Sequence, residues 1–269
     1  MKSFETIEIE QSGEIVTLYL NQPKFNMFSI QMMTDLIDYF HYLRNKPEIR
    51  FLIITTKGDH MTVGVDLNEL AGPLASDNPR AAENCRMHQL NGQELLRSLE
   101  SLEQVTVAAL RGAVVGAGMT MATSCDFRIM CEKSFFSIPE TNIGFYYTWG
   151  STPRLVEMLG VSKAMEIIMH CVPIYGPEAY DLGLVNRVVP DEPRNELMKT
   201  THEFIEKIAI RGTTAIRITK KIAIGAAMRG IGNMFIPETE MVEGMIGSGE
   251  PSEGIQAFLE KRTPKFGRK

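Results

Sequence analysis

Two glycine-containing turns are the segments of this sequence that are best suited to chemistry. The first is Val63-Gly64-Val65-Asp66 and the second is Gly112–Gly118 (GAVVGAG); each follows an apolar run and precedes a predicted helix. A helix that begins after a tight turn has unpaired N–H groups and a positive partial charge, and glycine lets a ligand approach that backbone closely. Two such turns lying together would form an oxyanion hole, where each donor is worth about 10²–10³ in rate. The alternative is that the glycines serve only tight strand-to-helix packing.

Glu140 is the candidate acid–base group. It directly follows Pro139 within an apolar stretch, SFFSIPETNIGF. An apolar wall disfavours the charged form of a carboxyl group, so the pKa of Glu140 should rise toward the range that is useful for proton transfer. The alternative is a solvated loop carboxylate, because a Pro-Glu pair alone is a weak signal.

Other common chemistries lack their motifs. GAVVGAGM does not fit the dinucleotide pattern GxGxxG, because Met121 stands three residues after Gly118. The sequence contains no GK[ST] phosphate loop, no HExxH and no GxSxG, and its four cysteines form no CxxC pair. We therefore expect no metal site and no disulfide, and free thiols in a reducing cytosol.

Composition excludes several classes of protein. The chain has 269 residues, a net charge of −5 and 44% hydrophobic residues, which disfavours a nucleic-acid groove or an anionic membrane surface. The N-terminus lacks the apolar segment of a signal peptide. The most apolar window, Val105 to Ala122, carries Arg111 and several glycines, so it is a poor membrane span. A cytoplasmic globular protein is expected.

Apolar patterning predicts an α/β core. Strands are expected at residues 7–9, 15–20 and 50–55, and a helix capped by Ser29 lies between the last two. Residues 71–92 are polar and unpatterned, which predicts a mobile loop entering a helix that ends near Leu102. Strands and helices then alternate to about Pro190. Beyond Pro193 we expect only helices, at 196–210, 213–228, 234–246 and 252–261, so the predicted units are a core over 1–192 and a helical region over 193–269.

These elements, in this order and spacing, resemble the crotonase (enoyl-CoA hydratase/isomerase) superfamily over nearly the whole chain. The segments that carry the resemblance are LYLNQPKFNMFS, HMTVGVDLNEL, VTVAALRGAVVGAGMTMATSCDFRI, SFFSIPETNIGF, GPEAYDLGLVNRVVP and AFLEKRTPKF. The resemblance implies a spiral of ββα units, with C-terminal helices that build a homotrimer or a dimer of trimers.

The resemblance also implies a set of site residues. Backbone N–H groups of Val65 and Ala117 would polarise the carbonyl of an acyl-CoA thioester, and Glu140 would be a catalytic glutamate. CoA would arrive as part of the substrate, so no separate cofactor is expected. The positions that match substrate-binding residues of the two turns and the C-terminal segment are Gly64, Asp66, Gly116, Gly118, Phe258 and Lys261.

The C-terminal pair, Phe258 and Lys261, matches positions that can reach the CoA of a neighbouring subunit in the family. Lys261 would there contact a phosphate or the adenine end of CoA. A solvated helix lysine is an equal alternative for this residue.

One departure from the family pattern concerns the chemistry. Hydratases of the family carry a second glutamate where this chain has Thr120. Thr120 cannot act as a carboxylate base, whereas moving a 3,4 double bond to the 2,3 position needs only one base. The sequence therefore favours a 3,2-enoyl-CoA isomerase that uses Glu140 alone. A hydratase or dehydratase in which Thr120 positions water, and a non-catalytic acyl-CoA-binding paralogue, are the alternatives.

A second departure follows Glu140, where hydratases commonly have a Pro-Gly-x-Gly-Gly turn. This chain instead has the aromatic run FYYTWG, which includes Tyr147 and the only tryptophan, Trp149. We expect these rings to shape the acyl end of the pocket, and a tyrosine there could donate a hydrogen bond or a proton. Ordinary core packing is the alternative for each ring.

Overall fold

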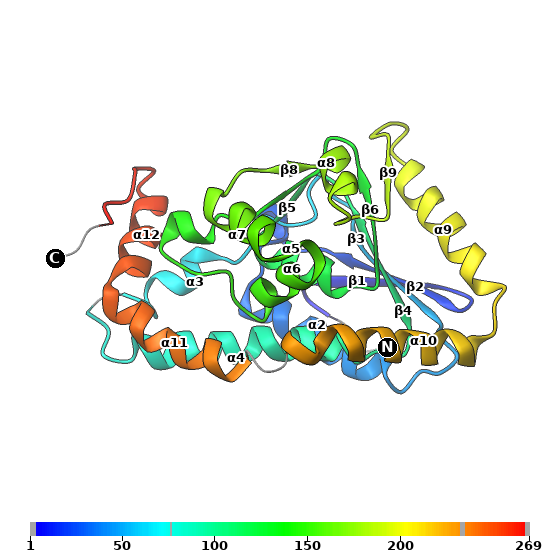
Figure 1. Cartoon of the computed structure of the whole chain (residues 1–269), viewed down its shortest axis with the longest axis horizontal. Helices are drawn as coiled ribbons and strands as arrows, with labels where there is room; N and C mark the ends of the chain where they lie inside the picture. The colour runs from blue at the N-terminus through cyan, green and yellow to red at the C-terminus, as the bar shows by residue number, and fades with distance from the viewer. Residues whose placement is uncertain (1–3, 76, 232–234, 267–269) are drawn as a thin grey trace.

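A six-stranded sheet with the order β1-β2-β3-β4-β6-β9 forms the centre of the computed structural model, which describes residues 4–75, 77–231 and 235–266 (Figure 1). β1 and β2 form an antiparallel hairpin, and every later strand joins in parallel. β3 and β4 are buried along nearly their whole length, as expected for parallel strands covered on both faces. The strands are β1 (Ile7–Ser12), β2 (Ile15–Leu20), β3 (Phe51–Thr56), β4 (Val105–Leu110), β6 (Phe127–Cys131) and β9 (Arg187–Val189).

A second, three-stranded sheet holds the elements that carry the candidate chemistry. It consists of β5 (Ala113–Val115), β7 (Phe135–Ser137) and β8 (Ile174–Tyr175). β5 and β7 are parallel, with Val115 opposite Ser137. The Gly116 N–H group donates to the Ser137 carbonyl oxygen at 2.9 Å. This pairing places the second glycine turn beside the segment that leads into Glu140.

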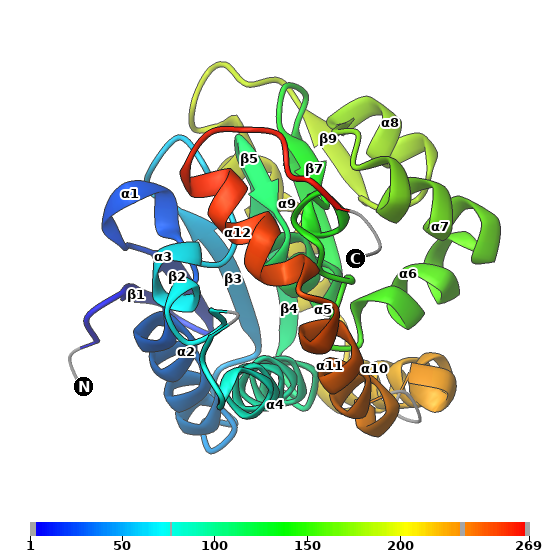
Figure 2. The same cartoon turned by 90° about the vertical axis from the view of Figure 1, so that its left-hand side faces the viewer.

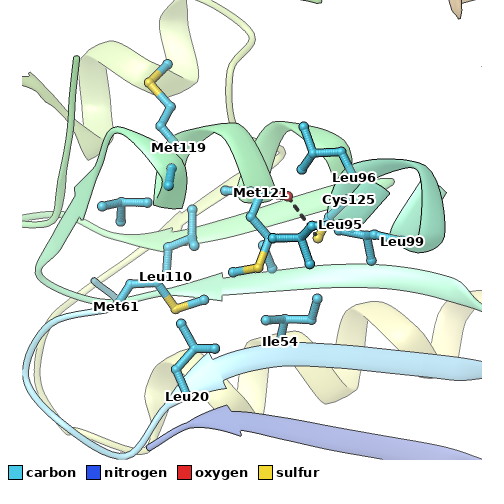
Figure 3. Packing of buried hydrophobic residues seen from close by; sticks show 14 of the residues in the cluster. Leu20, Ile54, Met61, Leu95, Leu96, Leu99, Leu110, Met119, Met121 and Cys125 are labelled. Carbon is cyan, nitrogen blue, oxygen red and sulfur yellow. Dashed lines mark hydrogen bonds between the residues drawn. The ribbon is translucent and has the colours of Figure 1, made fainter. Parts of the chain in front are cut away.

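Helices cover both faces of the large sheet. α9 packs against β4 and β6 on one face, while α2, α4 and α5 form the cluster on the other face. Figure 3 shows this second layer, in which Met121 of α5 and Leu95 of α4 lie over Ile54 and Leu110. The first helices are α1 (Pro23–Asn26), α2 (Ile30–Leu43), α3 (Leu67–Ala71), α4 (Ala81–Glu100), α5 (Ala117–Ser124) and the 3₁₀ turn η1 (Glu140–Ile143).

The remaining helices continue to the end of the described chain. α11 packs along α4, and α12 packs against η1 and α3, so the C-terminal helices return to the face of the core that carries η1 (Figure 2). Of the described helices, none is long and apolar enough to cross a membrane. These elements are α6 (Ser151–Leu159), α7 (Val161–His170), α8 (Gly176–Asp181), α9 (Glu196–Ala209), α10 (Thr213–Ile231), α11 (Phe235–Ser248) and α12 (Glu250–Leu259).

The predicted α/β class and C-terminal helices are confirmed. Ser29 caps α2, because its Oγ accepts from the Met32 N–H group at 3.1 Å. Met234, where one predicted helix begins, lies outside the described residues. Every described element after β9 is a helix, but the division at residue 192 and the trimer stay predictions.

The predicted loop over 71–92 is wrong for its second half. α4 begins at Ala81, so only residues 72–80 connect α3 to it. The buried side of the first turns of α4 consists of Ala81, Cys85, Gln89 and Gly92, at helical spacing. These residues are small or polar, so the face that packs on the core lacks the large apolar side chains by which helical periodicity is recognised.

We predict opposite effects of one substitution at two helical glycines. A Cβ atom on Gly92 of α4 would lie 2.0 Å from Cε2 of Trp149, whereas Gly225 of α10 has no atom within 4 Å of its Cβ position. Gly92→Ala should therefore cost about 1–3 kcal/mol of unfolding free energy through overpacking. Gly225→Ala should add about 0.5–1 kcal/mol, because alanine loses less backbone entropy. Urea unfolding measures both, and equal stabilisation by both variants would contradict the packing of Trp149 on α4.

Candidate active site

A parallel bridge between Thr62 and Val114 brings the two glycine turns together. The Thr62 N–H group donates to the Ala113 carbonyl oxygen at 3.1 Å, and the Val115 N–H group donates to the Thr62 carbonyl oxygen at 3.2 Å. A Cβ atom on Gly118 would lie 2.2 Å from Cγ2 of Thr62, so only glycine permits this approach. The convergence expected from the sequence is therefore present in the structure.

The two turns expose the backbone donors that the sequence predicts. Gly64 and Gly116 have φ values of +96° and +50°, which L side chains rarely adopt. These φ values reverse the direction of the chain at each glycine, and the next N–H group along the chain belongs to Val65 in the first turn and to Ala117 in the second. In the described part of the chain, neither of these N–H groups donates to another protein group. Both N–H groups are therefore available to a ligand.

Asp66 has a local structural role. It is the N-cap of α3, and its Oδ1 accepts from the Asn68 N–H group at 3.0 Å. Its own N–H group donates to the Phe28 carbonyl oxygen, and the Phe28 N–H group donates to the Gly64 carbonyl oxygen at 2.8 Å. Asp66 therefore fixes the first turn, and direct contact with substrate stays a prediction.

Glu140 lies over the start of α5. A Cβ atom on Gly116 would lie 2.5 Å from Oε1 of Glu140, so the absent side chain leaves room for the carboxyl group. Oε2 is buried and has no hydrogen-bond partner among the described residues. Burial raises the pKa of Glu140 from 4.5 to about 7. Burial of this carboxyl group is thus present, and it gives Glu140 a pKa at which it can both accept and donate a proton near neutrality.

Thr120 lies one turn further along α5 than Gly116, and its hydroxyl group contacts two other hydroxyl groups. The Thr120 hydroxyl donates to the hydroxyl oxygen of Tyr147 at 2.9 Å, and Ser151 donates to Thr120 Oγ1 at 2.9 Å. Tyr147 is only 1% exposed. Burial and then the charge of Glu140 raise its pKa above the usual value, so the phenol stays neutral. Thr120, at the position where the resemblance implies a second glutamate, therefore belongs to a neutral hydroxyl cluster, which we define as Thr120, Tyr147 and Ser151.

The indole ring of Trp149 packs on α4 at Gly92. Its φ value of 60° is unusual for a residue with a side chain, and its ring is buried. The indole lies over Gly92, and the His88 ring centroid is 5.5 Å away. Burial lowers the pKa of His88 to about 4, so this imidazole is neutral near pH 7. The contact that residues 81–92 make with Trp149 through His88 is therefore uncharged near pH 7.

Glu238 is a buried group that the sequence analysis did not identify. Its Oε2 accepts from the Gly150 N–H group at 2.7 Å, and its carbonyl oxygen accepts from the Tyr146 hydroxyl at 2.5 Å. Burial raises the pKa of Glu238 to about 7. Its partners lie 88 and 92 residues earlier in the chain, so no local motif could indicate it.

The C-terminal candidates lie on the surface. α12 contacts η1 because Gly254 approaches the Ile143 carbonyl, where a Cβ atom would lie 2.2 Å from the oxygen. The side chain of Phe258 is 59% exposed, and Lys261 is exposed as well. Contact of either residue with CoA stays a prediction.

Two further features bear on the location of the site. Within the described residues, no group of three or more His, Cys, Asp or Glu side chains could hold a metal ion. A cavity of about 620 Å³ lies at the other end of α5, between α6 and α10, where Cys125, Arg154 and Lys220 line it. It does not include Glu140 or either glycine turn.

Comparison with known proteins agrees with this geometry. A crotonyl-CoA hydratase of Syntrophomonas wolfei is 29% identical over 266 residues, which cover 98% of each chain. A peroxisomal Δ(3,5)-Δ(2,4)-dienoyl-CoA isomerase of Arabidopsis thaliana is 26% identical and covers 100% of this chain and 99% of the relative. A crystal structure of an enoyl-CoA hydratase from Mycobacterium avium subsp. paratuberculosis shares the fold, with a TM-score of 0.85, 22% identity and coverage of 99% and 100%. The family model for enoyl-CoA hydratase/isomerase matches residues 10–269. The chain belongs to the enoyl-CoA hydratase/isomerase family, the crotonase superfamily.

Proposed function

We propose that this protein acts on acyl-CoA thioesters through an enolate, and that it moves a 3,4 double bond to the 2,3 position. The observation that carries the proposal is one buried carboxyl group, Glu140, over Gly116 at the start of α5. The Ala117 N–H group is the next backbone donor along the chain. The base and one oxyanion donor therefore share a single helix terminus.

The two exposed N–H groups support enolate formation. When a base removes the α-proton of a thioester, negative charge develops on the carbonyl oxygen. The N–H groups of Val65 and Ala117 donate to that oxygen, and each such donor is worth about 10²–10³ in rate. CoA binds as part of the substrate and takes no part in the proton transfers.

The single carboxyl group supports isomerisation. Glu140 takes the proton from the α-carbon and returns it to the γ-carbon, so one C–H bond breaks, one forms and the double bond moves by one position. A pKa of about 7 suits both half-reactions, because the same group must act as base and then as acid. Thr120 and Tyr147 are neutral and do not compete for this proton.

Glu140→Gln should lower turnover by about 10²–10⁴, the usual worth of a positioned acid–base group. Affinity for an acyl-CoA should change little, because the amide keeps the size of the carboxyl group and leaves both oxyanion donors intact. Initial rates on a 3-enoyl-CoA, together with calorimetric binding of a saturated acyl-CoA, measure the two effects.

The matched control is Glu166→Gln on α7, an exposed glutamate that pairs with Lys163 at 2.7 Å. It should retain wild-type turnover. Near-normal turnover by Glu140→Gln would assign the base to another residue. If the protein only binds acyl-CoA and is not an enzyme, neither Glu140→Gln nor Glu166→Gln would show turnover.

The rate should rise with pH through about pH 7. Glu140 must be ionised to remove the α-proton, and kcat/KM reports the pKa of this group in the free enzyme. An acid limb of kcat/KM near pH 4.5 would mean that the carboxyl group is solvated rather than buried.

The free energy of unfolding should fall as pH rises, because the proton on Glu140 stabilises the folded state. The folded protein holds the proton of Glu140 up to about pH 7, whereas the unfolded chain releases it near 4.5, so the contribution to unfolding free energy is lost as pH rises between these values. Glu140→Gln should reduce this dependence to the part that Glu238 contributes, because burial raises the pKa of Glu238 to about 7 as well, and the variant should be more stable than wild type at pH 8 by on the order of 2 kcal/mol. Equal pH dependence in both proteins would contradict the burial of the carboxyl group.

The wild-type protein should create conjugation from a 3-enoyl-CoA, which raises the ultraviolet absorbance of the thioester. Assays on acyl chains of several lengths then define which acyl groups fit beside Trp149. Silence with every 3-enoyl-CoA, together with no exchange of α-protons on a saturated acyl-CoA in deuterated water, would contradict the enolate chemistry itself.

A further inference from the structure

We propose that the cavity of about 620 Å³ between α6 and α10 binds a free fatty acid, with the guanidinium group of Arg128 against its carboxylate. The proposal does not depend on the acyl-CoA chemistry of Glu140, because the cavity includes neither Glu140 nor either glycine turn. It assigns a second ligand site to the opposite end of α5. An acyl-CoA has no free carboxylate, so the ligand of this site is the acid and not the thioester.

The cavity has the size and the lining of a small-molecule site. Such pockets commonly measure about 300–1,000 Å³ and are lined mainly by apolar side chains with a few polar groups. β6 contributes Phe127, and α10 contributes residues that lie four positions apart on one helix face, Ile216, Lys220 and Ile224. No residue over 213–227 is fully buried. α10 therefore spans the cavity instead of packing closely on the core, and its apolar side is left for a ligand to cover.

One cation of the cavity has no carboxylate partner among the described residues. Arg128 lines the cavity and is only 7% exposed. Its Nε and Nη1 atoms donate to the carbonyl oxygens of Leu184, Ala122 and Cys125. Its Nη2 atom has no hydrogen-bond partner in the described part of the chain, yet it is not among the unpartnered atoms that are fully shielded from solvent. A ligand in the cavity can therefore accept hydrogen bonds from Nη2.

The other enclosed cations of the cavity are already paired with carboxylates. Lys220 lies 2.7 Å from Asp126, and Arg154 forms an ion pair with Glu100. Burial is the main cause that lowers the pKa of Arg128; the charge of Arg154 adds to this effect and the charge of Asp126 opposes it. A carboxylate beside Arg128 would stabilise the charged guanidinium, because an opposite charge nearby favours the charged form. The site therefore favours an anion over a neutral ligand.

The arrangement of charge and apolar surface fits an amphiphilic anion. A guanidinium group presents parallel N–H donors that match a carboxylate, and such charge-assisted hydrogen bonds are about twice as strong as neutral ones. Arg128 is buried, whereas Ala223 of α10 lines the same cavity and is exposed. The cation therefore marks the inner end of the cavity and α10 its open side. A linear chain can extend from Arg128 along the apolar face of α10.

The test is a calorimetric titration of the full-length protein with decanoate below its micelle concentration, with and without butyryl-CoA. One decanoate should bind per chain, and butyryl-CoA should leave this binding unchanged because the cavity lies apart from Glu140. Decan-1-ol has the same chain length and no charge. It should bind about 10–10²-fold more weakly, which is the worth of a hydrogen bond to a charged group.

Variants of the cavity test the two parts of the site separately. Arg128→Gln should weaken decanoate binding by about 10–10²-fold, while Arg128→Lys, which keeps the positive charge, should retain part of the affinity. Ala223→Trp should abolish binding because the indole fills the cavity beside α10. The matched control is Ala226→Trp, at an exposed alanine of α10 that does not line the cavity. Its affinity should stay within about threefold of wild type.

Three results would overturn the proposal and leave the proposed function of Glu140 standing. Absence of decanoate binding would mean that the cavity is closed in solution, for example by a second copy of the chain. Displacement of decanoate by butyryl-CoA would place the fatty acid at the Glu140 site. Equal affinities for decanoate and decan-1-ol would mean that Arg128 takes no part. Should Arg128→Gln fail to fold, the two tryptophan variants decide the question, because equal binding by Ala223→Trp and Ala226→Trp would also overturn the proposal.

Discussion

The buried hydroxyl of Thr62 is the contact on which the rest of the site depends. It donates to the Asn26 carbonyl oxygen at 2.5 Å and accepts from the Gly64 N–H group at 3.1 Å, while the backbone of Thr62 pairs with Val114. The side chain of Asn26 donates in turn to Thr56 Oγ1 and to the Met61 carbonyl. One threonine thus ties the early loop, the first turn and β5 together, and the positions of the Val65 and Ala117 N–H groups depend on it.

The electrostatics of the site follow from burial among neutral groups. Oε2 of Glu140 has no hydrogen-bond partner among the described residues, and His88 is uncharged near pH 7. The buried guanidinium of Arg128 lies at the opposite end of α5, where it donates to the Ala122 and Cys125 carbonyl oxygens. That cation compensates the negative end of the helix dipole. At the positive end, the Ala117 N–H group has no partner among the described residues. The pKa of Glu140 is raised by burial, which disfavours its charged form.

The parts of the site that the sequence could predict are those encoded in short segments. Gly64, Gly116 and Glu140 stand in local motifs, and their roles in turns or in an apolar wall follow from neighbouring residues. The β5, β7 and β8 strands were not predicted, because two or three residues are too few for a period-two pattern. The start of α4 was missed because small and polar residues line its buried face.

Contacts between distant segments could not be predicted at all. Tyr147 and Thr120 were both singled out, yet the bond between them depends on how the chain turns after η1. Glu238 had no visible role, because its acceptor function appears only when Gly150 is placed against α11. Such pairings are set by tertiary packing, and one sequence carries no local signal of them.

The bond from Gly150 to Glu238 also has a consequence for how the site is completed during synthesis of the chain. The residues of both glycine turns, Glu140 and Trp149 precede Gly150, but the carboxylate that accepts from Gly150 belongs to α11. A ribosome-bound chain that ends before residue 238 therefore contains every candidate catalytic residue but lacks the acceptor of the Gly150 N–H group. The turn behind Trp149 is therefore completed only when α11 docks, after the segments that carry both glycine turns and Glu140 have been synthesised.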